Sequence, residues 1–337
     1  MTPITQCIIG AGFVDASEFR RKDFRPDCVP GDRQTVTVPF NVTFPTGSAI
    51  RVIVTASDRG IDPGAHNAAL VGVVQNQALS TFDLMARNSD CGAGQAGFHW
   101  LAVAQTPGQE QLRSVAIRMG AVQPKIFAPD CGKGIGMFQA LDTHDWGVGF
   151  SPPFQRDPAV LLTACKLNCP PPNVGGHYFR DYGGLTQAGS AVVGIAQRSG
   201  VNGFNARARN SDCGSGWSAL YYVGVTQVFT PAGPAFDPQT RNMVVDTGAV
   251  GSLAFEPHCK VFDWVRVDIQ FSRPFLTPPV VLISANDAGE RKGNVAAVGI
   301  AADVTPWGFT LLARNSDCAA GHAGFYWVAF GCAEGCG

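Results

Sequence analysis

The hexapeptide ARNSDC occurs three times in this chain, at residues 86–91, 208–213 and 313–318. Each copy has an upstream partner that ends in cysteine: FRPDC at 24–28, FAPDC at 127–131 and FEPHC at 255–259. Each copy is also followed by an apolar segment: GFHWLAVAQ, ALYYVGVTQ and GFYWVAFGC in chain order. Self-similarity that recurs in a fixed order identifies three copies of one folding unit.

Composition is consistent with three compact units. The 337 residues are 45% apolar, so each unit is long enough to bury its own core. The formal net charge is −1, with no basic block, so nothing attracts nucleic acid or an anionic membrane at long range. No apolar run reaches the roughly 18 residues that a membrane span needs. We therefore predict no nucleic-acid partner and no membrane insertion.

The residues that flank the apolar segments predict that these segments are strands. The chain contains 40 glycines and 23 prolines, and its apolar segments are short and bounded by Gly, Pro, Asn and Asp. Residues 34–44 and 265–271 alternate between apolar and polar side chains, as in a sheet with one buried face. Residues 159–164 and 278–284 are nearly continuous apolar runs and are expected to be central strands. The predicted fold is all-β: three tandem antiparallel β-sandwiches of about six strands each.

The repeats set the expected domain boundaries. The three units are predicted at 1–109, 110–232 and 233–337, with linkers at 106–111 and 229–239 that contain Pro and Gly. The second unit differs from the others by an inserted loop at 165–184.

Six of the eleven cysteines recur with the repeats, one in each upstream segment and one in each hexamer. The natural pairing joins Cys28 to Cys91, Cys131 to Cys213 and Cys259 to Cys318. Disulfides imply an oxidising compartment, so we expect an extracellular protein. Because the sequence MTPITQCIIG lacks the pattern of a signal peptide, leaderless export and a trimmed precursor are both open routes, and cytoplasmic storage also stays open.

The other five cysteines are an odd set, so at least one is expected to be free or intermolecular: Cys7, Cys165, Cys169, Cys332 and Cys336. The segments CKLNC and CAEGC favour local disulfides over a zinc site, because each spacing occurs only once. No metal or cofactor is predicted.

The polar tetrad RNSD is not needed by a disulfide, and two interpretations are open. In the first, Asn, Ser and Asp form a turn while Arg pairs with a carboxylate, which makes the tetrad a loop-shaping device. In the second, the tetrad is a binding loop, because Arg, Asn and Asp together supply the donors and acceptors that sugar hydroxyls require.

The segments FLTPPVVLISANDAG and WGFTLLARNSDCAAGHAGFYWVAFG resemble the H-type lectin domain. The resemblance covers most of the third unit and is weaker in the other two. It implies a six-stranded sandwich that binds galactose or N-acetylgalactosamine and associates in threes. Where many members have a strand arginine that contacts sugar, this chain has Ala69, Ala191 or Ala296, and the arginine of the hexamer is expected to supply the charge. The predicted carbohydrate-binding residues are Arg87, Asn88, Ser89, Asp90, Arg209, Asn210, Ser211, Asp212, Arg314, Asn315, Ser316 and Asp317.

Other candidates favour structural roles. Trp100, Tyr222 and Trp327 share one register of the last strand and are expected in the core. His99 and His322 do not share a register, and no Ser/His/Asp set or carboxylate pair recurs, so no enzyme is predicted. The acidic loops at 58–64 and 286–293 lack a convincing calcium-ligand spacing.

Two classes of function remain. The first is a multivalent lectin or agglutinin for glycans on cell surfaces or glycoproteins, with its three units packed around a pseudo-threefold axis. The alternative is a non-catalytic structural or protein-interaction scaffold of disulfide-stapled sandwiches.

Overall fold

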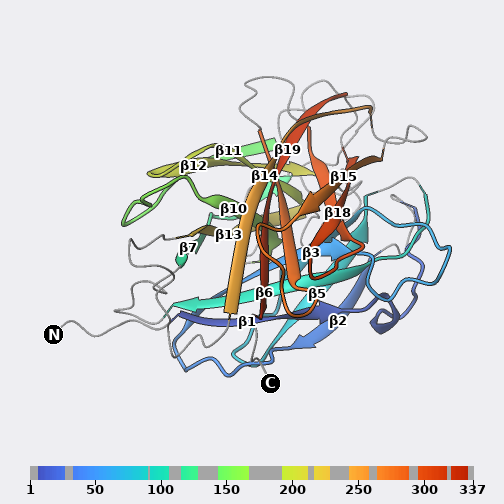
Figure 1. Ribbon diagram of the computed structural model, residues 1–337, viewed down its shortest axis with the longest axis horizontal. Coiled ribbons are helices and arrows are strands. Elements are labelled where there is room, and N and C mark those ends of the chain that lie inside the picture. Colours follow the sequence, from blue (N-terminus) through green and yellow to red (C-terminus); the bar gives the residue numbers. More distant parts are fainter. Residues whose placement is uncertain are drawn as a thin grey trace, which may run out of the picture.

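The described part of the chain consists of β-strands that turns and loops connect, as the sequence predicts (Figure 1). This computed structural model describes residues 7–26, 33–89, 92–105, 115–127, 143–166, 192–211, 216–227, 243–257, 264–287, 295–316 and 320–332. The one helical element in those ranges is a short 3₁₀ turn, Ala16–Glu18, whose first residue is buried. No helix within the same ranges is long and apolar enough to cross a membrane.

The described strands divide among the three repeats in the expected order. Repeat 1 contributes β1 (Cys7–Val14), β2 (Gln34–Pro39), β3 (Ala49–Ser57), β4 (Leu70–Gln75), β5 (Thr81–Asn88) and β6 (Gly97–Gln105). Repeat 2 contributes β7 (Val115–Ala121), β8 (Lys125–Phe127), β9 (Thr143–Gly149), β10 (Ala159–Cys165), β11 (Val192–Gly200), β12 (Gly203–Asn210) and β13 (Gly216–Gln227). Repeat 3 contributes β14 (Met243–Phe255), β15 (Val265–Gln270), β16 (Val280–Asn286), β17 (Ala297–Ala302), β18 (Gly308–Asn315) and β19 (Gly321–Cys332).

Hydrophobic patterning places these strands as expected. The apolar residues of β15 are half-buried and alternate with exposed polar ones. Every residue of β10 and β16 is buried, and each of these strands is third or fourth in the order of its sheet. One prediction is too long: the strand expected at 34–44 ends at Pro39. Beyond it, Phe40 and Phe44 bend toward each other with ring centroids 5.0 Å apart, so this segment packs as an aromatic loop instead of continuing the sheet.

The three sheets are shared between repeats, which the prediction of separate antiparallel sandwiches does not include. The strand orders are β1-β6-β3-β17-β18-β15, β2-β5-β4-β10-β13-β7 and β14-β19-β16-β11-β12-β9, with β8 also pairing β13. Each order joins three strands of one repeat to three strands of another. Strands pair antiparallel within a repeat, but the junctions β3–β17, β4–β10 and β11–β16 are parallel. The sheets are therefore mixed, and the repeats close into a ring in which each contacts both others.

Aromatic side chains fill equivalent positions in the core of each repeat. Phe271, Phe275, Phe309 and Trp327 form one cluster, and corresponding residues cluster in repeats 1 and 2. The large ring of the last strand lies over a glycine of the first strand, where a Cβ would come within 3 Å of the ring: Gly12 under Trp100, Gly120 under Tyr222 and Gly248 under Trp327. Trp100 and Trp327 are buried, which confirms their assignment to the core, and Tyr222 is half-buried.

Candidate functional site

The three hexamers begin at the ends of equivalent strands. Arg87, Arg209 and Arg314 are the next-to-last residues of β5, β12 and β18. Each stands directly opposite a valine of the neighbouring strand: Val71, Val193 or Val298. Directly opposed residues of an antiparallel pair share a face. All three hexamers therefore occupy the same position relative to the junctions between repeats.

The asparagines and serines of the hexamers are buried, and backbone groups satisfy them. Asn88 is 0% exposed, and its Nδ2 donates to the carbonyl oxygens of Arg25 (3.0 Å) and Gly92 (2.8 Å). Asn315 Nδ2 donates in the same way to Glu256 O at 2.7 Å. Both acceptors, Arg25 and Glu256, lie three residues before the cysteine of the upstream segment. In repeats 1 and 3, the asparagine thus ties the hexamer to its upstream partner.

The serines fix the other side of the loop. Ser89 donates both its N–H (2.9 Å) and its hydroxyl (2.8 Å) to Ala69 O, and Ser316 repeats this pair on Ala296 O at 2.8 and 2.6 Å. Ala69 and Ala296 are two of the positions where the resemblance would place an arginine. Asn210 and Ser211 are equally buried in repeat 2. All six Asn and Ser side chains are thus oriented by the protein itself.

The three arginines differ in their surroundings. Arg87 is 6% exposed, whereas Arg209 and Arg314 are half-buried. The guanidinium carbon of Arg314 lies 5.4 Å from the centroid of the Trp264 ring, a cation–π distance. The corresponding positions before β2 and within β9 hold Arg33 and Thr143, so this aromatic support belongs to repeat 3.

Several predicted site residues lie outside the described ranges. These are the aspartates Asp90, Asp212 and Asp317, the six repeated cysteines and most of the insertion at 165–184. The proposed disulfides therefore stay a prediction. In repeat 1, however, Phe24 and Gly94 exchange both of their backbone hydrogen bonds, at 2.8 and 3.2 Å, which brings the segments that carry Cys28 and Cys91 side by side.

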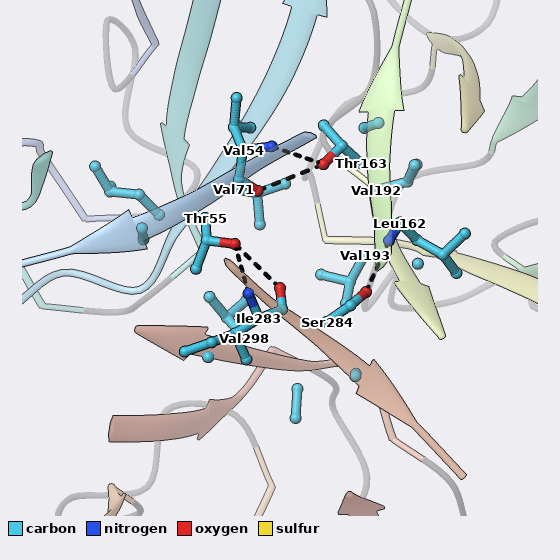
Figure 2. A pocket seen from close by; sticks show the side chains of 18 residues that line it. Val54, Thr55, Val71, Leu162, Thr163, Val192, Val193, Ile283, Ser284 and Val298 are labelled. Carbon is cyan, nitrogen blue, oxygen red and sulfur yellow. Dashed lines mark hydrogen bonds between the residues drawn. The ribbon is translucent and has the colours of Figure 1, made fainter. Parts of the chain in front are cut away.

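A small cavity lies where the three repeats meet (Figure 2). Its volume is about 60 Å³, and its walls come from β3, β4, β10, β11, β16 and β17, the six strands of the parallel junctions. Val71, Val193 and Val298 line it, and glycine or alanine occupies seven of the other fifteen positions. Three hydroxyl side chains, Thr55, Thr163 and Ser284, are also part of this lining.

Three hydroxyls around this cavity join the repeats cyclically. Thr55 Oγ1 accepts from Ile283 N at 2.9 Å, Thr163 Oγ1 accepts from Val54 N at 3.0 Å, and Ser284 Oγ accepts from Leu162 N at 3.0 Å. Each hydroxyl reaches the backbone of another repeat, so that repeat 1 binds 3, repeat 3 binds 2 and repeat 2 binds 1 (Figure 2). Thr55, Thr163 and Ser284 stand at the same place in the segments VTAS, LTAC and ISAN, so a comparison of the three repeats could have found these hydroxyls.

His99 forms a further link between repeats 1 and 3. Its Nδ1 lies 3.0 Å from Val281 N and 2.9 Å from Val281 O. Complete burial, with the positive charge of Arg59 nearby, lowers the pKa of His99 to about 4. Its ring is therefore neutral near pH 7, and Nδ1 can accept the hydrogen of Val281. This is a structural histidine in an interface between repeats.

The acidic loop at 58–64 is engaged in protein contacts. Asp62 Oδ1 pairs with Lys22 Nζ at 2.6 Å, and this bond lowers the pKa of Asp62. Asp58 Oδ2 accepts from Asp303 N of repeat 3, and burial raises the pKa of Asp58. Among the residues that the structure describes, no three His, Cys, Asp or Glu side chains gather as a metal site would require.

One exposed aromatic side chain is absent from the sequence-based candidates. Trp307, in the turn between β17 and β18, is 69% exposed, and Leu276 is 51% exposed. Comparing the three repeats at this turn could have found it, because the other two carry Ser80 and Asn202 there.

Comparison of the chain with protein-family models, curated proteins and solved structures finds no match.

Proposed function

We propose that this protein is a multivalent carbohydrate-binding protein, a lectin for galactose- or N-acetylgalactosamine-type glycans. Its three repeats would be H-type lectin-like sandwiches around a pseudo-threefold axis. The observation that carries the proposal is the placement of three identical hexamers at the same register beside the junctions of a closed ring. A ring of this kind presents three like loops in fixed relative positions.

Within each loop, the buried residues have a structural role, and the remaining polar residues are the ones that would contact sugar. Asn88 and Ser89, with their counterparts, hold the backbone and are oriented by internal hydrogen bonds. The arginine and the aspartate would then contact the sugar, because the guanidinium offers several hydrogen-bond donors and the carboxylate is a charged acceptor. Arg209 and Arg314 are more accessible than Arg87, so repeats 2 and 3 are expected to bind more strongly than repeat 1.

Three weak sites in one rigid ring gain from avidity. Engagement of a second site on the same glycan-coated surface raises the overall affinity by roughly 10² to 10⁴ without any new contact. Loss of one site should therefore weaken agglutination, and loss of all three should end it.

The experiment replaces Asp90, Asp212 and Asp317 together by Asn, which keeps side-chain size and removes the charge. Loss of a charged hydrogen bond to ligand typically costs about 1.5 to 3 kcal/mol, or some ten- to hundredfold in affinity at each site. Binding to a glycan array and agglutination of cells are the readouts, with circular dichroism to verify folding. Asp157→Asn removes an exposed charge outside the hexamers and serves as the control. A folded triple variant that binds as the wild type does would exclude the hexamers as sugar sites.

A second candidate function is a structural or protein-interaction scaffold. The observation in its favour is that backbone carbonyls engage Asn88, Ser89, Asn315 and Ser316, a role that needs no ligand. If the triple aspartate variant unfolds, and if the wild type binds no glycan, the tetrad is a loop-shaping device and the scaffold function holds.

A further inference from the structure

The exposed side chains Trp307 and Leu276 lie at one end of repeat 3, away from its hexamer. Trp307 immediately precedes β18, whereas the hexamer of this repeat begins at the other end of the same strand. Trp307 is the most exposed of the six tryptophans, and the other five are buried or half-buried. An exposed tryptophan together with an exposed leucine calls for more explanation than a single exposed apolar side chain does.

The fold does not require an aromatic residue at this turn. Phe271 N donates to Trp307 O at 2.9 Å, and the same bond is made by Phe150 N to Asn202 O (2.9 Å) and by Phe40 N to Ser80 O (2.8 Å). Three different side chains thus occupy one backbone geometry. Leu276, which directly follows Phe275, corresponds in the same way to Gln155 in repeat 2 and Pro45 in repeat 1. Repeat 3 alone places Trp and Leu at these two neighbouring positions.

Hydrogen bonds within the turn also fix the backbone that carries the Trp307 indole. Phe275 N donates to Pro306 O at 2.9 Å, Thr305 N donates to Gly308 O at 2.9 Å, and Trp307 N donates to Thr305 Oγ1 at 3.2 Å. The Asp246 carboxylate, 2% exposed, accepts from Ser272 N at 2.6 Å and so anchors the segment that leads to Leu276. A rigid aromatic side chain loses little conformational entropy on binding.

Polar groups surround this apolar pair. Arg273, Thr277 and Thr305 are exposed on the same two segments. Further along β15 and β18, Arg266 Nη2 lies 3.1 Å from Thr310 Oγ1 and 3.3 Å from Asp303 Oδ2, and Thr310 Oγ1 donates to Asp268 Oδ1 at 2.8 Å. Three aspartates, Asp246, Asp268 and Asp303, accompany the two arginines at this end, so it has no electrostatic attraction for an anionic membrane surface.

We infer that Trp307, with Leu276 beside it, is an aromatic platform that binds the apolar face of a pyranose ring. Two side chains are too few for a protein interface, which buries about 800 Å² on each partner. One indole does match the size of a single sugar ring, and the neighbouring threonines and charged groups can bond its hydroxyls. The inference rests on the proposed carbohydrate-binding function and adds to it a site separate from the hexamers.

The test uses the intact chain and substitutions that the other repeats already carry. Trp307→Asn and Leu276→Gln install the residues of repeat 2, so the turn is expected to fold. The control is Leu79→Gln, which removes an apolar side chain, 37% exposed, from the corresponding turn of repeat 1. The probes are immobilised glycans that end in galactose, N-acetylgalactosamine, glucose or mannose. We expect Trp307→Asn to weaken binding about tenfold or more, because tryptophan is among the residues that dominate binding interfaces. Leu276→Gln should have a smaller effect and Leu79→Gln none.

A second readout follows Trp307 directly. N-bromosuccinimide should oxidise this tryptophan first, and the bound glycan should protect it, as read by mass spectrometry of peptides. If Trp307→Asn binds the same glycans as the wild type does and no glycan protects Trp307, the platform is excluded while the lectin function stands. If Trp307→Asn loses binding while the triple aspartate variant keeps it, the platform stands and the hexamer sites fail. Protection by phosphatidylcholine vesicles, or by raising the protein concentration without glycan, would instead assign the surface to a membrane or a second copy and overturn the inference.

Discussion

Asn88 is enclosed by carbonyl groups of the chain on both sides of its loop. Its amide donates to Arg25 O and Gly92 O, and no part of its side chain reaches solvent. An amide in this position contributes to stability because its own donor groups are buried and these two acceptors satisfy them. Arg87, the preceding residue, is nearly as buried, with 6% of its surface exposed.

We expect Asn88→Ala to lower the free energy of unfolding by about 1 to 3 kcal/mol, because the hydrogen bonds from this buried amide to Arg25 O and Gly92 O are lost. Thermal or urea unfolding measures the change. Thr43→Ala, at an exposed loop position of the same repeat, should change stability by less than about 0.5 kcal/mol. Equal stability of Asn88→Ala and the wild type would contradict the structural role assigned to this amide.

His99 predicts a pH dependence of stability. Its pKa is about 4 in the folded chain, mainly through burial, and 6.5 when unfolded. Between these values the unfolded chain binds a proton that the folded chain does not, so protons favour unfolding. Stability is therefore full above pH 6.5 and falls as the pH drops toward 4, by about 3 kcal/mol from this residue. Unfolding at pH 7 and pH 4.5 should show the loss, and His99→Gln should reduce it. A wild-type stability that rises on acidification would contradict the assignment.

At the scale of strands, a glycine of the first strand of each repeat packs closely against an aromatic ring of the last strand. A Cβ at Gly248 would lie 2.5 Å from Trp327 Cζ2, a separation that requires the ring or the strand to move. Gly251, in the same strand β14, has no atom within 4 Å of such a Cβ. The two glycines thus form a matched pair within one element.

Gly248→Ala is expected to destabilise the protein by about 1 to 3 kcal/mol through overpacking against Trp327. Gly251→Ala should be neutral, or slightly stabilising because alanine restricts the unfolded chain. Denaturant unfolding of the two variants tests the difference. If both variants lost the same stability, the contact between Gly248 and Trp327 would not be the cause.

The segments around the hexamers support a prediction about disulfides. Asn88 ties its hexamer to Arg25, and Asn315 ties its own to Glu256, so in repeats 1 and 3 a hydrogen bond joins the two segments that carry the proposed cysteine pair. Peptide mapping without reduction should recover Cys28–Cys91, Cys131–Cys213 and Cys259–Cys318. Each closes a loop long enough to stabilise the fold by roughly 4 kcal/mol in the chain-entropy model. Free thiols at these positions after non-reducing digestion would disprove the pairing.

Local sequence patterns predicted strands well, but they did not predict which strands pair between repeats. Alternation at 265–271 predicted a strand with one buried face, and the nearly continuous apolar run at 278–284 predicted a central strand, because burial on one face or on two leaves a pattern in the sequence. The parallel junction β3–β17 leaves no such trace, since its register joins only Ile300 to Ala56 and Ala301 to Ser57. Thr163 recurs as Thr55 and Ser284 in the other repeats, but its hydrogen bond to the backbone of another repeat follows only from the fold. Likewise, the hexamer pattern indicated a special loop but could not distinguish buried donors from exposed ones.

At the scale of the whole molecule, no repeat can complete a sheet by itself. Repeat 1 provides half of two sheets, and its strands β3 and β4 are edges unless β17 and β10 cover them. Exposed edges of this kind invite aggregation. The hydroxyls of Thr55, Thr163 and Ser284 then connect the repeats in a cycle, so disturbing one junction affects both neighbours (Figure 2).

This shared architecture predicts a single cooperative unfolding transition for all three repeats. We expect calorimetry to show one peak, because a repeat that unfolds alone would remove half of a sheet from each of the other two repeats. Thr163→Val, which keeps the side-chain shape but removes the acceptor of Val54 N, should shift that whole peak to lower temperature by an amount equivalent to about 1 to 3 kcal/mol. Thr35→Val, at an exposed position of β2, should leave it in place. Independent domains joined by linkers would give separate transitions, of which Thr163→Val would move only the one that belongs to repeat 2, and that result would refute the closed ring as the unit of stability.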